Sequence, residues 1–394
     1  MSGPSEPHEI YLDHAASTPL RPSARDAWLA AASKHHANPT GSHLAAREAR
    51  RALDGAREQV ATALGAHPGE VVFTSGGSEA DNMAVRGALG ARGPDAVAVT
   101  TEVEHHAVHD PVERAGGVMV GVDERGMVDL DALAEVLRAR DGDVAVVSVI
   151  AVNNETGSIN PLRDVAGVVR DLAPEALLHT DAVQAVNWID VAAETAGYDL
   201  VSVTGHKVGS PVGTGVLLVR DGVELDPLIV GGGQERGRRA GTPDVAGAVS
   251  FAAALVEATE QRDESTERLR VLRDGLIDGL ADRFGDRVLV SAAPDGGDRS
   301  HLAAGIANVC IAGVQSEALL FLIDAAGVRA SAASSCSSGA QDPSHVLAAM
   351  GVPRDVALGS LRLSLGHTST AADVERAVEV ISASVERLDR FEGG

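Results

Sequence analysis

The sequence has very little lysine. Only two lysines occur, Lys34 and Lys207, although lysine and arginine together number 33. Arginine can replace lysine wherever only positive charge matters, but its guanidinium stays protonated and cannot form a Schiff base. A lysine that persists in such a composition is therefore a candidate for covalent chemistry, although Lys34 shows that persistence alone proves nothing.

Cysteine, long apolar runs and positive charge are scarce as well. Two cysteines in 394 residues give no disulfide framework, which predicts a reducing, cytoplasmic location. No run of eighteen apolar residues occurs, so no membrane span is expected, and the first ten residues lack the basic start and apolar stretch of a signal peptide. The formal net charge is −23. Nucleic acid and anionic membranes favour clustered positive charge, so neither is expected as a direct partner.

What is present is a regular alternation of two patterns. From about residue 47 to 220, short apolar runs typical of buried strands alternate with alanine-rich amphipathic stretches typical of helices. This order predicts a mainly parallel sheet with helices on both faces. The strand-like runs are 71–73, 97–99, 144–150, 177–178, 200–201 and 215–219, and the helical patterns include 45–64, 79–89 and 130–139.

The chain changes character after a glycine-rich loop at 231–242. It continues with a long helical pattern at 245–280, β-type runs at 288–290 and 306–311, and helices near 316–326 and 371–388. A chain of 394 residues also exceeds what one hydrophobic core usually spans. We therefore expect an α/β protein with a large domain at 21–258 and a smaller α+β domain formed by 1–20 and 259–394.

Residues that suit a phosphate follow the first predicted strand. In residues 73–82, FTSGGSEADN, a strand ends in a Ser/Gly turn and a helix begins. Free backbone N–H groups and the helix dipole converge at such a turn and favour an anion. An ordinary glycine turn with a serine N-cap has the same pattern. This segment alone therefore does not favour a phosphate site over an ordinary turn.

Two further strand ends make the interpretation specific. Asp181 directly follows a buried strand, at the sheet edge where α/β folds place ligands, and its carboxylate can pair with a pyridinium nitrogen or cap a helix. Thr204, His206 and Lys207 follow the next strand, where the first two can bind a phosphate and the lysine can condense with an aldehyde. A lysine taken alone is usually a solvated surface charge. Three such strand ends in this order instead predict a site for pyridoxal 5′-phosphate (PLP), carried by Lys207.

The sequence also resembles the cysteine desulfurases of the class V aminotransferase family, in the branch that serves iron–sulfur assembly and thiolation. Eight strings, collinear over nearly the whole length, carry the resemblance. They are YLDHAA at 11–16, FTSGGSEADN at 73–82, EHHAV at 104–108, NNETG at 153–157, HTDAVQ at 179–184, GHK at 205–207, GGGQERG with RAGT at 231–242, and RLSLG at 362–366. The resemblance implies a homodimer of the PLP fold type I, with a mainly parallel seven-stranded sheet in the large domain.

The same resemblance implies roles for individual residues. Lys207 would carry PLP, Asp181 would contact the ring nitrogen, and Gln184 would contact the ring hydroxyl. His105 would stack on the ring and help to move protons. The phosphate would be bound by Gly77, Ser78, Thr204, His206 and, from a second subunit, Thr242. Asn154 would contact the cofactor. The substrate L-cysteine would be bound by Asn38, Asn154 and Arg362, and a bidentate guanidinium suits its carboxylate.

Cys336 decides the reaction that the resemblance implies. Its surroundings at 331–339, SAASSCSSG, are small and polar, which predicts a mobile, exposed loop. By resemblance its thiolate would attack the sulfur of cofactor-bound L-cysteine, leave L-alanine, and pass the persulfide to an acceptor, either an iron–sulfur scaffold or a thiolation enzyme. A transient iron–sulfur contact at Cys336 fits the same role. Cys310, in the strand-like run 306–311, is expected to be buried and inert.

The sequence departs from the family pattern at three places. Cys336 follows Ala-Ser-Ser at 333–335 where Gly-Ser-Ala is more usual, which leaves the transfer rate and the choice of acceptor open. Ser210 replaces a glycine near Lys207, and His14 replaces a frequent asparagine. None of these changes removes a catalytic group.

Other functions stay open at this point. A selenocysteine lyase shares the cofactor chemistry without needing Cys336, a transaminase or epimerase would release no sulfide from cysteine, and a silent assembly scaffold would carry no cofactor. Histidines offer a metal alternative, since His105 and His109 have i, i+4 spacing and His35, His36 and His43 cluster. No cysteine or second converging carboxylate accompanies them, so no metal site is predicted.

Overall fold

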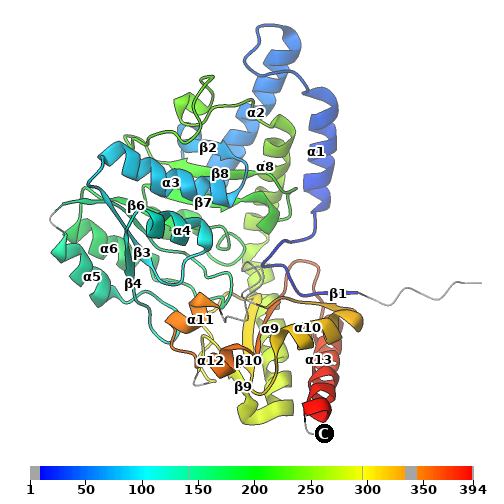
Figure 1. Ribbon diagram of the computed structural model, residues 1–394. Helices are drawn as coiled ribbons and strands as arrows, with labels where there is room; N and C mark the ends of the chain where they lie inside the picture. Colours follow the sequence, from blue (N-terminus) through cyan, green and yellow to red (C-terminus); the bar gives the residue numbers. More distant parts are fainter. Residues whose placement is uncertain (1–8, 141, 295, 333–343, 393–394) are drawn as a thin grey trace, which may run out of the picture.

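The computed structural model describes residues 9–392 except 141, 295 and 333–343. Its main body is a seven-stranded sheet in the order β2-β8-β7-β6-β5-β3-β4 (Figure 1). The strands are β2 (Val71–Thr74), β3 (Val97–Thr101), β4 (Val118–Val120), β5 (Val144–Ser148), β6 (Leu177–Asp181), β7 (Leu200–Thr204) and β8 (Gly215–Val219). β8 runs antiparallel to both neighbours and the other pairs are parallel. The predicted mainly parallel, seven-stranded sheet is confirmed.

Helices cover both faces of this sheet because strand side chains alternate between them. On β8, Leu217 packs in a core with helix α3, whereas Val216 and Leu218 pack in the largest core on the opposite face. One face carries α3 (Gly77–Arg92) and α4 (His106–Arg114); the other carries α2 (Leu44–Ala63), α5 (Leu130–Ala139), α6 (Leu162–Leu172) and α8 (Val245–Glu260). Helix α1 (Pro22–Lys34) lies beside α8 (Figure 1). Helix α7 (Val191–Glu194) is short.

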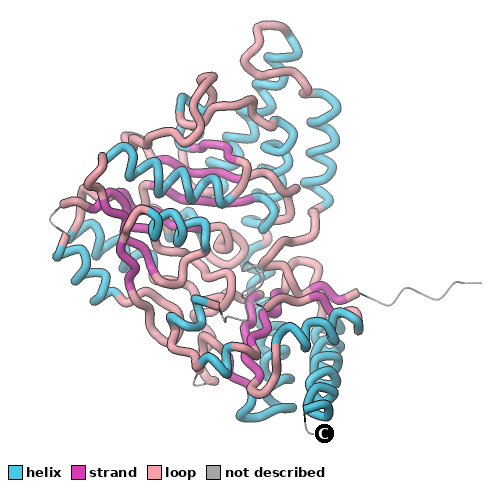
Figure 2. The backbone as a smooth tube through the Cα atoms, in the orientation of Figure 1, coloured by secondary structure: helices cyan, strands magenta, loops and turns pink. Residues whose placement is uncertain are grey.

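A second group of elements lies below the large sheet in Figure 1 and has its own apolar core. Its antiparallel sheet, in the order β12-β10-β9, is formed by β9 (Val288–Val290), β10 (Ile306–Ile311) and β12 (Ser360–Ser364). Its helices are α9 (Arg262–Phe284), α10 (Ser316–Ala325), α11 (His345–Ala349), α12 (Arg354–Ala357) and α13 (Ala371–Glu392). The pair β1 (Ile10–Tyr11) and β11 (Val328–Arg329) joins the start of the described chain to it (Figure 2). The domain limits at residues 20 and 258 remain a prediction.

Three details bear on the sequence predictions. The long helix expected at 245–280 is two helices, α8 and α9, that meet at Gln261. Backbone hydrogen bonds continue across that residue, from Gln261 N to Glu257 O and from Ser265 N to Gln261 O, so the two helices follow one another without a loop between them. Strand β4 was not predicted. Cys310 is fully buried in β10, as expected. Among the described helices, none is both long and apolar enough to cross a membrane.

Candidate active site

Asp181 and Lys207 lie at the ends of neighbouring parallel strands. β6 ends at Asp181, and β7 ends at Thr204, which leads directly into a single 3₁₀ turn over Gly205–Lys207. Asp181 is 3% exposed and accepts a hydrogen bond from Val183 N at 2.8 Å. Burial raises the pKa of the Asp181 carboxyl to about 6, although the positive charge of Lys207 opposes that rise. The predicted convergence of a carboxylate and an amine at one sheet edge is therefore present.

The amine of Lys207 lies against the N-terminal segment of the chain. Its Nζ donates to the carbonyl oxygens of Ala15 (2.5 Å) and Ala16 (2.8 Å). Gln184 Nε2 donates to the same Ala15 oxygen at 2.6 Å. The structure thus brings Lys207 and Gln184 together, as the sequence predicted. It also shows that two backbone carbonyls accept hydrogen bonds from the amine. Such contacts cannot be predicted from residue types, because every residue has a backbone carbonyl.

Arg21 and Asn187 support the lysine turn and were missed by the sequence analysis. Arg21 is 5% exposed, and its Nε donates to Val208 O at 2.9 Å. Asn187 Nδ2 donates to Lys207 O at 2.8 Å. A Cβ on Gly209, whose φ is +90°, would lie 2.6 Å from Arg21 Cγ, so the turn requires glycine there. The two side chains hold the backbone carbonyls of the predicted cofactor lysine and of the residue that follows it.

The glycine turn before α3 packs against the ends of both β6 and β7. A Cβ on Gly77 would lie 2.7 Å from Val183 Cγ2 and 3.7 Å from Thr204 Cβ. The N-terminus of α3, which contains Ser78, therefore points its first turn at the strand end that carries Thr204 and the lysine turn. His206 is half-buried beside Lys207, and burial lowers its pKa to about 4. Four of the predicted phosphate contacts, Gly77, Ser78, Thr204 and His206, thus lie at one edge of the sheet.

His105 caps helix α4 next to this edge. Its Nδ1 accepts from Ala107 N at 3.1 Å, so the proton of the neutral ring is on Nε2. Burial, aided by the charge of Lys207, lowers the pKa of His105 to about 4. The ring is therefore neutral near pH 7. Its Nδ1 lone pair is engaged by the helix, and its Nε2–H has no hydrogen-bond partner among the described residues.

Arg362 on β12 belongs to the part of the site that was predicted to bind the substrate. It is 5% exposed, and its Nη1 and Nη2 donate to Asn154 O (3.1 Å) and Asp13 Oδ1 (2.9 Å). Its Nε has no hydrogen-bond partner among the described residues. The predicted substrate residues Asn154 and Arg362 are therefore in contact. Asn38, by contrast, is exposed, and its Oδ1 accepts from the backbone and hydroxyl of Thr40, so contacts among the described residues do not tie it to this group.

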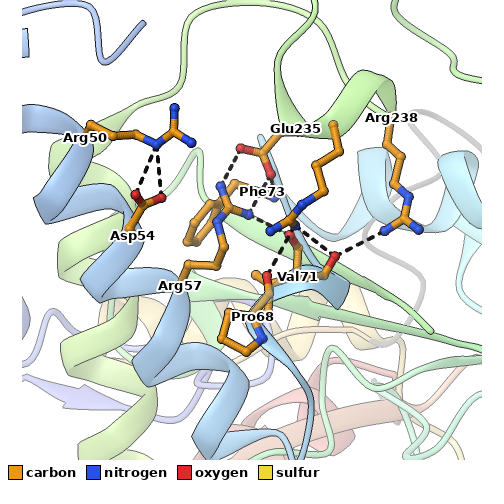
Figure 3. Close-up of polar contacts among 10 residues, drawn as sticks. Arg50, Asp54, Arg57, Pro68, Val71, Phe73, Glu235 and Arg238 are labelled. Atoms are coloured by element: carbon orange, nitrogen blue, oxygen red, sulfur yellow. Dashed lines mark hydrogen bonds and ion pairs between the residues drawn. The ribbon is translucent and has the colours of Figure 1, made fainter. Parts of the chain in front are cut away.

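Thr242 lies in the glycine-rich loop, and the same loop is anchored by a buried ion pair (Figure 3). Thr242 itself is exposed in the protomer. Arg57 on α2 donates from Nη1 and Nη2 to the two carboxylate oxygens of Glu235, both at 2.8 Å, and Glu235 Oε2 also accepts from Phe73 N at 3.1 Å. Arg239 in turn pairs with Glu79 on α3 at 2.9 Å. The loop is thus fastened to the strand and helix that flank the glycine turn.

Cys336, with residues 333–335 before it, lies outside the described residues. The chain on each side of 333–343 is described. Ser331 exchanges two backbone hydrogen bonds with Arg362, at 2.8 and 3.3 Å. On the other side, the Ser344 hydroxyl donates to Glu155 Oε2, and His345 Nε2 donates to Glu104 O at 3.0 Å. The residues before the segment therefore contact β12, which carries Arg362. The residues after it contact Glu104, which directly precedes His105.

Comparisons with known proteins agree with this geometry. The family profile for aminotransferase class-V matches residues 10–377. An IscS-like cysteine desulfurase from Mycobacterium tuberculosis is 45% identical, over 96% of this chain and 97% of the relative. The cysteine desulfurase IscS of Dictyoglomus turgidum is 38% identical, over 96% and 95%. The solved structure of a NifS-like protein superimposes with a TM-score of 0.87 at 31% identity, covering 96% of this chain and all of that one. The chain belongs to the class-V aminotransferase family and, within it, to the cysteine desulfurases.

Proposed function

We propose that this protein is a PLP-dependent cysteine desulfurase that converts L-cysteine to L-alanine and holds the released sulfur as a persulfide on Cys336. The observation that carries the proposal is the placement of Lys207 and Asp181 at adjacent strand ends, beside the glycine turn of α3. An amine, a buried carboxylate and a helix N-terminus at one edge match the aldehyde, ring nitrogen and phosphate of PLP.

The residues present fit this cofactor. A carboxylate that is 3% exposed, such as Asp181, is costly to bury without a cationic partner. A protonated ring nitrogen would supply that partner, and it would hold the Asp181 carboxyl ionised against the effect of burial. The missing side chain at Gly77 allows the backbone of α3 to pack against Val183, just after β6, and this brings the N–H groups of the first turn of α3 to the sheet edge where a phosphate would lie. When bound, PLP supplies an electron sink for the charge that develops at the substrate Cα.

Individual residues of the chain would then have separate roles in binding and catalysis. Lys207 would carry the cofactor and, once released, take and return the proton at the substrate Cα. The neutral His105 would stack on the ring and present its Nε2–H. Arg362 and Asn154 would hold the substrate carboxylate, with Asn38 as a further substrate contact. Gln184 would contact the ring hydroxyl. The Cys336 thiolate would attack the substrate sulfur, forming the S–S bond as the carbon–sulfur bond breaks. The electron pair of the broken bond would stay with the substrate carbon, which takes up a proton to become the methyl group of alanine.

The proposal extends to assembly and partners. Thr242, exposed in the protomer, would bind the phosphate of a second subunit in a homodimer. The Cys336 persulfide would pass to a sulfur-acceptor protein, an iron–sulfur scaffold or a thiolation enzyme, in the cytoplasm. The large domain would comprise residues 21–258, and residues 1–20 with 259–394 would form the small domain that carries Cys336.

Two matched substitutions test the cofactor role. Lys207→Arg keeps the charge but removes the amine, so the visible absorbance of the bound cofactor should disappear and alanine formation should fall by several orders of magnitude. Lys34→Arg, the same change at the other lysine, should alter neither. Normal absorbance and turnover in the Lys207 variant would contradict the assignment.

A third variant tests the sulfur chemistry. Cys336→Ala should retain cofactor absorbance and lose alanine formation from L-cysteine, because the nucleophile that removes sulfur is gone. Turnover of L-selenocysteine by the same variant shows that the remaining site is intact. Undiminished desulfuration of L-cysteine would overturn the role of Cys336 and would favour a selenocysteine lyase.

A further inference from the structure

Three histidines and an aspartate from helices α4 and α11 lie close together; both helices are labelled in Figure 1. His106, His109 and Asp110 lie on α4 at i, i+3 and i+4, positions that share one face of a helix. One ligand atom from each lies within 4.8 Å of the other two. The ring of His345, the first residue of α11, is centred 4.8 Å from the His106 ring and 5.2 Å from the His109 ring. We propose that this cluster binds one divalent transition-metal ion of the zinc class.

The distances suit such an ion. A tetrahedral zinc with ligand bonds of about 2.0–2.1 Å holds neighbouring donor atoms roughly 3.3 Å apart. Asp110 Oδ1 lies 3.0 Å from His106 Nδ1 and 3.7 Å from His109 Nδ1, values on either side of that separation. Small rotations of the exposed His106 and Asp110 side chains would equalise them. Imidazole and carboxylate together are ligands that zinc commonly takes.

The Nδ1 atoms of His109 and His345 are each suited to bind a metal ion. His109 Nδ1 is buried and has no hydrogen-bond partner among the described residues, an unfavourable state that a metal would relieve. His345 donates from Nε2 to the backbone carbonyl of Glu104 at 3.0 Å, which leaves the lone pair on Nδ1. A metal-binding histidine usually gives its other N–H to a carbonyl or carboxylate in this way. His345 is therefore the candidate fourth ligand.

An ordinary surface arrangement explains only part of the cluster. His106 and Asp110 form an i, i+4 hydrogen-bonded pair on their own, and such pairs are common on exposed helices. That pair does not account for the unpartnered nitrogen of His109 or for the third imidazole brought in from α11. Arg86 and Arg114 line the same surface hollow as His106 and Asp110. Since these cations repel a metal, we expect weaker binding than at a closed four-ligand site.

The position gives the site a structural consequence. α4 begins directly after His105, and α11 begins two residues after the segment 333–343 that contains Cys336. An ion shared by His106, His109, Asp110 and His345 would join these two helices. Binding only to the folded protein would also raise its thermal stability. The inference is independent of the proposed desulfurase activity, since its ligands are none of the residues assigned to cofactor or substrate.

Zinc titration of the holoenzyme tests the site. A Cys336→Ser background leaves the buried Cys310 as the remaining thiol, and isothermal titration with zinc chloride should then give one ion per protomer. His109→Ala and Asp110→Asn should each weaken binding at least tenfold, and His345→Ala should weaken it as well. His36→Ala, at an exposed histidine elsewhere, should leave binding unchanged.

Two further readouts make the result decisive. X-ray absorption of the zinc-loaded protein should show imidazole nitrogens at about 2.0 Å, and zinc should raise the melting temperature of the parent but not of His109→Ala. Unchanged cofactor absorbance will show that each variant is folded. No binding in the parent, or equal binding in His109→Ala, Asp110→Asn and His36→Ala, would overturn the proposal.

Discussion

Arg57 and Glu235 form a bidentate ion pair that is almost closed to solvent, with side-chain exposures of 9% and 3%. The pair fixes a backbone that is otherwise unfavourable: Glu235 and Arg236 have φ of +45° and +57°, in the left-handed region that non-glycine residues rarely adopt. The Arg57 guanidinium also donates to Val71 O and lies 4.9 Å over the Phe73 ring. The ion pair therefore holds the loop that leads to Thr242.

Removing the arginine should be strongly destabilising. Arg57→Ala leaves the Glu235 carboxylate buried without a cation, which typically costs about 3–5 kcal/mol. Urea unfolding should report this loss, and hydrogen exchange should become faster in the loop around Glu235. We also expect weaker cofactor retention in the dimer if Thr242 reaches the partner's phosphate.

A nearby pair provides the control (Figure 3). Arg50 and Asp54 lie on the same helix and are bridged at 3.0 Å, but their side chains are 58% and 49% exposed. Arg50→Ala should therefore change the free energy of unfolding by less than about 1 kcal/mol. Equal effects of the Arg50 and Arg57 substitutions would contradict the structural role of the buried pair.

Glu155 should make stability depend on pH. It is 7% exposed, and burial raises its pKa to about 7, against 4.5 for an ordinary glutamate. Between these values the folded protein keeps a proton that the unfolded chain releases, so this group lowers stability as pH rises from 4.5 to 7. Glu155→Gln removes that dependence and should be the more stable protein at pH 8, by up to roughly 3 kcal/mol.

The comparison needs two pH values and a control. At pH 4 the advantage of Glu155→Gln should vanish, since the wild-type carboxyl is protonated in both states. Glu260→Gln, at an exposed position, should show no comparable difference between pH 4 and pH 8. A constant offset between wild type and Glu155→Gln across this range would show that the carboxyl does not titrate as described.

Arg362 should determine the affinity for substrate. Arg362→Lys keeps the charge but loses the planar fork that binds a carboxylate with two parallel hydrogen bonds. We expect KM for L-cysteine to rise about 10–100-fold, equivalent to roughly 1.4–2.7 kcal/mol, with kcat changing less and cofactor absorbance unchanged. Arg376→Lys, on the exposed face of α13, is the matched control. An unaltered KM would remove Arg362 from the substrate site.

Much of the sheet could be predicted from sequence because each strand is a short apolar run bounded by a polar turn. Asp181 and Lys207 could be predicted for the same reason, since both directly follow such runs. Strand β4 was not predicted because it has only three residues, Val118–Val120, of which only Val120 is buried. The division between α8 and α9 at Gln261 was not predicted because helical hydrogen bonding continues through it, and no proline or glycine marks it.

The supporting contacts could not be predicted. Ala15 and Ala16 contribute backbone oxygens, and any residue has those. Arg57 is one arginine among many, although a signal existed: it lies four residues after Leu53 on the buried face of α2. An arginine at an apolar helical position indicates a buried partner, but nothing in the pattern points to Glu235, which is 178 residues away.

The most direct test of the desulfurase mechanism is mass spectrometry of the two cysteine peptides after treatment of the holoenzyme with L-cysteine under non-reducing conditions. Cys310, fully buried in β10, is the internal control. The mechanism predicts one added sulfur atom on the Cys336 peptide, formed together with L-alanine, and none on the Cys310 peptide. Alanine formation with an unmodified Cys336, when transfer to any acceptor is excluded, would contradict it.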